Sequence, residues 1–140
     1  MSQTPYHAYA NDLAHVVREA RKLPLGGLSP APRPTLDPNA PAALFFAPHP
    51  DDETISGGPA LRLLREAKMR VVNVAVTQGS RKARQAERLK ELQAACDYLG
   101  FEVETTVPGG LEKINSKARA GDAQHWTACV KVILGLLQKC

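Results

Sequence analysis

One strand–helix–strand unit decides the fold: residues 42–77 have the sequence AALFFAPHPDDETISGGPALRLLREAKMRVVNVAVT. The unit begins with a short apolar run over residues 42–47 and ends with residues 70–77, which are rich in β-branched side chains; both patterns predict strands. Between them, residues 57–68 carry apolar side chains at helical spacing, and Pro59 falls in the first turn, where proline is tolerated. We therefore expect two parallel strands joined by a right-handed helical crossover.

The same alternation continues toward the C-terminus. We expect a helix over about residues 81–99, opened by Ser80 and closed by Gly100, and then a strand over residues 101–107. A polar loop should extend to residue 121, followed by an apolar helix that Asp122 caps. The order predicts an α/β fold, a parallel sheet with helices on both faces. Because an apolar last helix should be followed by a further strand, we expect the chain to be the N-terminal part of a longer polypeptide.

The first 41 residues have a different character. Residues 6–23 show helical spacing of apolar side chains, and Pro24 predicts the end of that helix. Residues 25–41 are rich in proline and glycine, which indicates an extended connection. We therefore divide the chain into a helix with a connecting arm, residues 1–41, and a main domain, residues 42–140.

Composition limits the class of protein. The chain has 140 residues, enough for one domain with a core, and no apolar stretch approaches the roughly 20 residues of a membrane span. Three widely spaced cysteines do not form a disulfide framework, and the first ten residues do not resemble a secretory signal. We therefore expect a cytoplasmic protein without a membrane span.

The net charge of +4 arises largely within residues 81–90, which contain five basic side chains. A nucleic-acid interface would need a denser basic stripe with stacking aromatic rings, and aromatic residues make up only 5% of the chain. We therefore expect no nucleic-acid partner and interpret the basic residues as a solvated helix face.

Residues 48–53, PHPDDE, follow the first strand directly and place an imidazole and three carboxylates together. His49 and Asp52 are three residues apart, so a tight turn can direct both at one metal ion, and zinc accepts these ligands. Asp51 would then point toward the water that the metal activates and act as a general base. Glu53 could orient a ligand through a hydrogen bond or favour the start of the following helix.

Two alternatives remain open for this motif. An Asp-Asp-Glu run is also typical of the first turn of a helix, where negative charge is favourable. Magnesium would accept the carboxylates, although His49 favours zinc or another divalent transition metal.

Three motifs in this chain resemble the PIG-L/LmbE-like zinc de-N-acetylases. The first is residues 48–53 with the following Gly57-Gly58, and the second is Thr77-Gln78-Gly79. The third is Arg88-x-x-Glu91-x-x-x-Ala95-x-x-x-Leu99-Gly100. Together they extend the resemblance over about residues 42–140.

The resemblance implies a Rossmann-like fold and a zinc hydrolase. In that family the residues matching His49 and Asp52 bind zinc, the residue matching Asp51 is the general base, and the residue matching Arg88 holds the substrate. The family removes acetyl groups from N-acetylglucosamine-type molecules and releases acetate and a free amine. We therefore expect a small N-acetylated sugar as substrate.

The family's third zinc ligand, a later histidine, has no counterpart in this sequence. His7 and His15 fall in the N-terminal helix and His125 at the start of the last one, where we expect surface or structural roles. Two rival functions stay open: a zinc hydratase of the same fold, which would release no acetate, and a non-catalytic α/β binding module, which would hold no tight metal. Homo-oligomerisation also stays open.

Overall fold

The computed structural model describes residues 4–24, 26–55 and 57–139. It divides into two compact units, residues 1–30 and 31–140. The first unit contains α1 (Pro5–Ala20), which begins with a proline in its first turn and has no buried residues. The helix expected over residues 6–23 is therefore present and ends at Ala20. The domain boundary after residue 41 stays a prediction.

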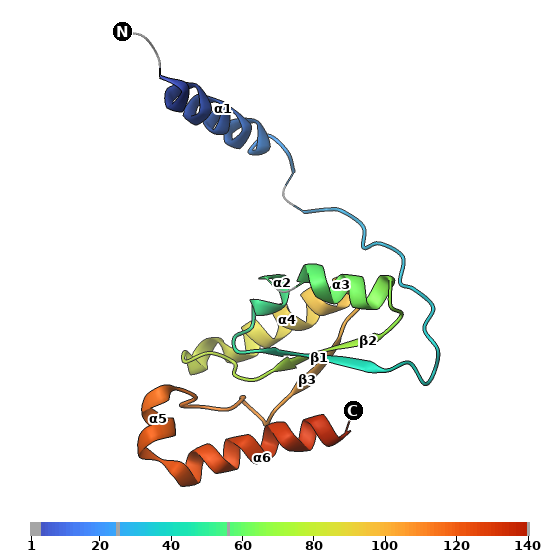
Figure 1. The fold of residues 1–140 in the computed structure, drawn as a ribbon, viewed down its shortest axis with the longest axis vertical. Coiled ribbons are helices and arrows are strands. Elements are labelled where there is room, and N and C mark those ends of the chain that lie inside the picture. The colour runs from blue at the N-terminus through green and yellow to red at the C-terminus, as the bar shows by residue number, and fades with distance from the viewer. Residues whose placement is uncertain (1–3, 25, 56, 140) are drawn as a thin grey trace. The chain divides into compact units, whose positions relative to one another are not determined.

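The second unit is built on a three-stranded sheet (Figure 1). Its strands are β1 (Ala42–Ala47), β2 (Arg70–Ala75) and β3 (Glu102–Thr105), in the spatial order β1-β2-β3. Both pairs are parallel, with Ala42 opposite Arg70 and Val72 opposite Glu102. The expected parallel sheet is confirmed, and strands adjacent in sequence are adjacent in space.

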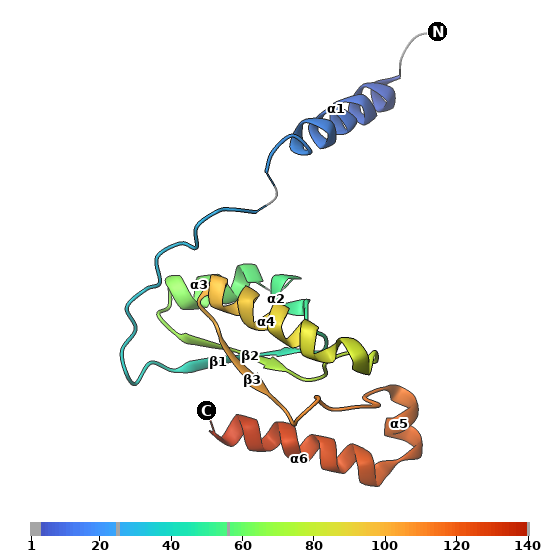
Figure 2. The same cartoon turned by 180° about the vertical axis from the view of Figure 1, so that it is seen from behind.

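Helices cover both faces of this sheet, as the sequence predicts. The helices α2, α3 and α4 lie on one face and α6 lies on the other in both views (Figures 1 and 2). Their bounds are α2 Asp52–Ile55, α3 Gly57–Arg65, α4 Gln85–Leu99, α5 Ser116–Gly121 and α6 Ala123–Lys139.

Three details of these helices differ from the expectation. The short helices α2 and α5 were not expected, since each is too brief to show a helical period. The helix expected from residue 81 begins as a 3₁₀ turn, Lys82–Arg84, and becomes α-helical at Gln85. Ser80 does not open it, because Arg81 occupies the capping position without a side-chain hydrogen bond. Gly100 closes α4 in the left-handed conformation, φ 85°, as expected.

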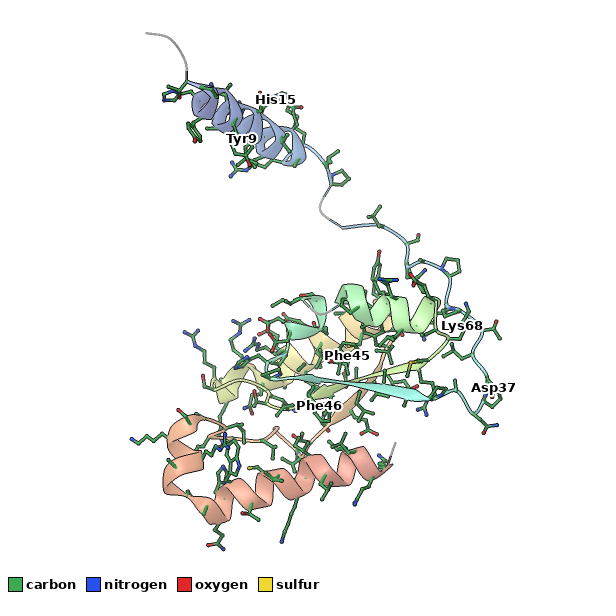
Figure 3. The ribbon with its side chains drawn as sticks, in the orientation of Figure 1. Tyr9, His15, Asp37, Phe45, Phe46 and Lys68 are labelled. Atoms are coloured by element: carbon green, nitrogen blue, oxygen red, sulfur yellow. The ribbon has the colours of Figure 1, made fainter. Side chains whose placement is uncertain are left out.

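The core lies between the sheet and helices α3 and α4. Phe45 and Phe46 point to opposite faces of β1 (Figure 3), and Phe45 packs against the core. In β2, Val72 and Val74 alternate with the core residues Val71 and Ala75 and are almost fully buried toward the other face. The buried members of the core are Ala60, Leu64, Val71, Ala75, Leu92, Cys96 and Phe101.

The helix α6 is fixed at both ends by polar contacts. Asp122 Oδ1 accepts a hydrogen bond from the His125 backbone N–H at 2.9 Å, which confirms the expected cap. At the other end, Lys139 Nζ lies 2.8 Å from Glu104 Oε1 of β3. Within the described ranges, no helix combines the length and the apolar character needed to cross a bilayer.

An ion pair between β2 and β3 gives a testable pH dependence of stability. Glu102 accepts hydrogen bonds from Arg70 Nε at 2.8 Å and Nη2 at 2.6 Å, and these bonds lower the pKa of the Glu102 carboxyl. A lowered folded-state pKa stabilises the fold above the ordinary glutamate pKa of about 4.3, and the contribution disappears as pH falls through the lowered value.

We expect Glu102→Gln to reduce the free energy of unfolding by about 0.5 kcal/mol near pH 7, because the pair is partly exposed. The difference between the variant and the parent protein should be smaller at pH 3 than at pH 7, because protonation removes the charge of Glu102. Urea unfolding at both pH values measures it, and an equal difference at both would contradict the assignment.

Candidate active site

The site lies where the chain leaves the carboxyl ends of β1 and β2. The Val76 backbone N–H donates to the Ala47 carbonyl at 2.9 Å, extending the strand pairing by one bond. Beyond it, Thr77 Oγ1 donates to the Pro48 carbonyl at 2.6 Å. These bonds hold the two loops side by side, at the edge where ligands bind in parallel α/β sheets.

The turn after β1 brings His49 and Asp52 together. Asp52 Oδ2 accepts a hydrogen bond from the His49 backbone N–H at 2.7 Å and lies 3.6 Å from His49 Nδ1. Two ligands of a tetrahedral zinc ion are separated by about 3.4 Å, given bonds of about 2.1 Å. The donor types and their spacing therefore fit one zinc ion. The His49 side chain is 63% exposed, which leaves room for further ligands.

A third protein ligand does not come from the described residues, which hold no cluster of three or more His, Cys, Asp or Glu side chains able to bind a metal. His125 is engaged elsewhere: its Nε2 lies 3.0 Å from the Glu112 carbonyl oxygen and 3.6 Å from Cys129 Sγ. Its contacts agree with the structural role expected for it. The described residues therefore offer two candidate ligands, whereas a catalytic zinc site needs at least three.

Asp51 and Arg88 form a second pair beside the first. Arg88 Nη2 lies 3.5 Å from Asp51 Oδ2 and 3.4 Å from the Pro50 carbonyl oxygen. The guanidinium of α4 thus reaches the turn after β1 and contacts both the candidate base and the backbone beside it. The Asp51 side chain remains accessible, since it is 66% exposed.

Two hollows meet at Arg88. One, of about 520 Å³, is bordered by His49 and by the loop that follows β2. The other, of about 440 Å³, is bordered by Asp51 and the start of α4. Arg88 and Ser80 border both. The structure thus places the candidate ligand and the candidate base on either side of the candidate substrate-binding arginine.

Glu53 points into the protein rather than into either hollow. It is 6% exposed, and burial, followed by the negative charges of Asp51 and Asp52, raises the pKa of its carboxyl. Its charge also contributes to the raised pKa of the Cys96 thiol, about 11, although burial is the larger cause. Among the described residues, Glu53 Oε2 has no hydrogen-bond partner. Its role in orienting a ligand stays a prediction.

The loop after β3 borders the hollow that contains His49. The sequence did not reveal this contact. The Leu111 backbone N–H donates to the Val76 carbonyl at 2.8 Å, and Gly110 pairs with Thr77 in an antiparallel bridge. Lys82 Nζ lies 2.6 Å from Glu112 Oε1, and this contact lowers the pKa of the Glu112 carboxyl. The only sequence signal that this loop turns back toward the end of β2 was the Pro108-Gly109-Gly110 turn.

Gly110 allows the loop after β3 to approach Thr77 and Gln78 closely. It has φ +76°, and a Cβ there would lie 2.8 Å from the Gln78 backbone nitrogen and from Thr77 Cα. We expect Gly110→Ala to lower the free energy of unfolding by about 2 kcal/mol, because the strained backbone and the collision add. Gly135→Ala in α6, where a Cβ meets nothing within 4 Å, is the matched control and should be stabilising. The midpoints of thermal unfolding of the two variants test this prediction. Equal midpoints would contradict the close approach of Gly110 to Thr77 and Gln78.

The segment that contains the candidate site matches a known protein family. The sequence profile of the family described as PIG-L, GlcNAc-PI de-N-acetylase, matches residues 44–125, more than half of the chain. The chain belongs to the PIG-L family. The match spans His49, Asp51, Asp52 and Arg88 and confirms the resemblance seen in the motifs.

A curated relative extends the comparison. Over 94 residues the chain is 38% identical to the 1D-myo-inositol 2-acetamido-2-deoxy-alpha-D-glucopyranoside deacetylase of Segniliparus rotundus. The matched segment covers 66% of this PIG-L chain and 29% of the length of the relative. No solved structure matches the chain significantly.

Proposed function

We propose that this chain provides the metal-binding and proton-transfer part of a zinc-dependent de-N-acetylase. The reaction removes the acetyl group from an N-acetylglucosamine-type conjugate and releases acetate and a free amine. The supporting observation is the approach of His49 Nδ1 to Asp52 Oδ2, 3.6 Å, inside the segment that matches the PIG-L family. The relative is named as a deacetylase of an acetamido sugar, which supports the same substrate class.

His49 and Asp52 would hold the zinc ion in this proposal. Zinc bound there would supply Lewis-acid chemistry, which polarises the acetamide carbonyl and makes a water more acidic. Asp51 takes a proton from the attacking water as the oxygen adds to the carbonyl carbon. The same carboxyl then delivers the proton to the nitrogen as the carbon–nitrogen bond breaks.

Arg88 has the position needed to orient the substrate between these groups. It borders both hollows, so a sugar bound against its guanidinium would face His49 on one side and Asp51 on the other. Gly79 makes the close approach of Arg88 possible, since a Cβ at this residue would lie 2.6 Å from Arg88 Nη1. Catalytic contacts of this kind tighten when substrate binds.

Two measurements on the protein test the proposal: the zinc content, and the release of acetate from a panel of N-acetylated glucosamine conjugates. The proposal expects stoichiometric zinc and acetate formation. Zinc without acetate from any conjugate would favour the hydratase, and the absence of tightly bound metal would favour the non-catalytic binding module. We further propose a cytoplasmic location, which the free thiols of Cys96 and Cys129 support.

A further inference from the structure

The helix α1 has an apolar face that nothing else in its own unit covers. The described part of residues 1–30 forms no other helix or strand. The largest apolar side chains of this face are 48–84% exposed, and they are Tyr6, Tyr9, Leu13, Val16 and Val17. A helix of 16 residues is only marginally stable in water unless its apolar face packs against a partner. This face is therefore a candidate interaction surface.

The charges of α1 favour a protein partner over a membrane surface. Within Pro5–Ala20 the charged side chains are Asp12, Arg18 and Glu19, which give a net charge of −1 with neutral histidines. Helices that lie on a lipid surface carry many lysines and arginines on their polar face, because these attract anionic lipids. A second helix with a matching apolar face needs no such excess of positive charge.

The spacing of the apolar residues indicates which helix would fit. Tyr6, Tyr9, Leu13, Val16 and Ala20 alternate three and four residues apart, the a and d positions of a heptad repeat. Their size falls along the helix, from tyrosine near its start to alanine at its end. In an antiparallel pair, where a packs against d, Tyr9 lies opposite Ala20 of the second helix and Leu13 opposite Val16. The face is thus complementary to a reversed copy of itself, as a twofold interface requires.

We propose that two copies of this chain form a dimer by packing their α1 helices antiparallel along this face. Covering the five largest side chains in both copies would bury up to about 1,200 Å², the lower limit for stable interfaces. Asp12 and Glu19 of the two copies would share one edge of the pair. Their repulsion is partly offset by Lys22, whose Nζ lies 2.7 Å from Glu19 Oε1. The dimer is therefore weak, and it does not depend on the proposed de-N-acetylase function.

Analytical ultracentrifugation of the whole chain between about 1 and 200 μM tests the proposal, since a weak dimer dissociates in this range. We expect the mass to rise with concentration from 15.1 kDa toward twice that value. The variant Leu13→Gln/Val16→Gln places amides in the apolar seam and should stay at 15.1 kDa throughout. The control His15→Gln/Arg18→Gln changes the polar face and should dimerise like the parent protein.

The fluorescence of Trp126, the single tryptophan, monitors the fold of the second unit in each variant. We expect it to stay unchanged, because α1 has no buried residues. A parent protein that remains at 15.1 kDa at the highest concentration would overturn the proposal. So would a dimer that persists in the Leu13→Gln/Val16→Gln variant, or one that is lost equally in the control.

The size of residue 20 tests the antiparallel alignment. Ala20→Tyr would place a tyrosine opposite Tyr9 of the second copy, so we expect the dimer to weaken by about tenfold, the usual effect of overpacking. Adding Tyr9→Ala to this variant restores one large and one small side chain in each layer and should recover most of the affinity. A dimer that tightens in the Ala20→Tyr variant would refute the antiparallel pair, because only a parallel pair would place the two new tyrosines together.

Discussion

Replacing Asp51 by asparagine is expected to lower the rate of acetate release by about 10²–10⁴-fold, the usual contribution of a positioned general base. The amide cannot take a proton from the attacking water, although it keeps the size of the carboxylate and a partner for Arg88 at 3.5 Å. Zinc content should remain that of the parent protein, because Asp51 is not one of the two converging ligands. The measurements are initial rates of acetate formation and the metal content of the same preparation.

A carboxylate elsewhere on α4 controls for the general loss of a negative charge. Asp97 lies near the C-terminal end of that helix and binds Arg33, so Asp97→Asn should leave the rate unchanged. Full turnover by the Asp51→Asn variant with zinc in place would remove Asp51 from the mechanism and leave the proton transfer to another group.

The second large effect concerns the metal itself. We expect His49→Ala or Asp52→Ala to weaken zinc binding by at least about 100-fold, since loss of a residue that merely orients a ligand already costs 10–100-fold. Competition with a chromogenic chelator measures this affinity. His125→Ala is the matched control, because its ring contacts the Glu112 carbonyl and Cys129 rather than the candidate site.

Undiminished zinc affinity in the His49→Ala variant would show that any metal binds elsewhere. Far-ultraviolet circular dichroism of each variant, and of the parent protein after chelation, separates loss of a ligand from loss of the fold. We expect these spectra to coincide, because His49 is largely exposed and contributes little to packing.

The sequence predicted the sheet because its strands are short and strongly apolar. Residues 42–47 form a parallel pair with residues 70–75, two residues shorter than the strand expected over 70–77, and Gly100 ends α4 as its position indicated. Ser80 misled the prediction: a serine before a basic run suggested a cap, but Arg81 stands in the extended conformation and a 3₁₀ turn intervenes. Local capping preferences are weak compared with the tertiary contacts that fix where a helix begins.

At the site, sequence spacing was informative only within one turn. The convergence of His49 and Asp52 was predictable because they are three positions apart in a turn stiffened by Pro48 and Pro50. The return of Gly110 to Thr77 was not predictable, since a contact across 33 residues depends on the whole sheet. The hollow that collects Arg81 and Arg84 beside Asp51 was missed for the same reason.

The hydrogen bond from the His49 backbone to Asp52 Oδ2 has a consequence for how an ion would enter. Because the His49 backbone N–H holds this turn in place, the conformational entropy of the loop is lost during folding and not when the ion binds. Binding of the cation would then exchange its water molecules for the His49 and Asp52 side chains, and release would reverse this exchange. The turn would keep the same shape in both states. The metal would then leave and bind again without a change in the surrounding fold.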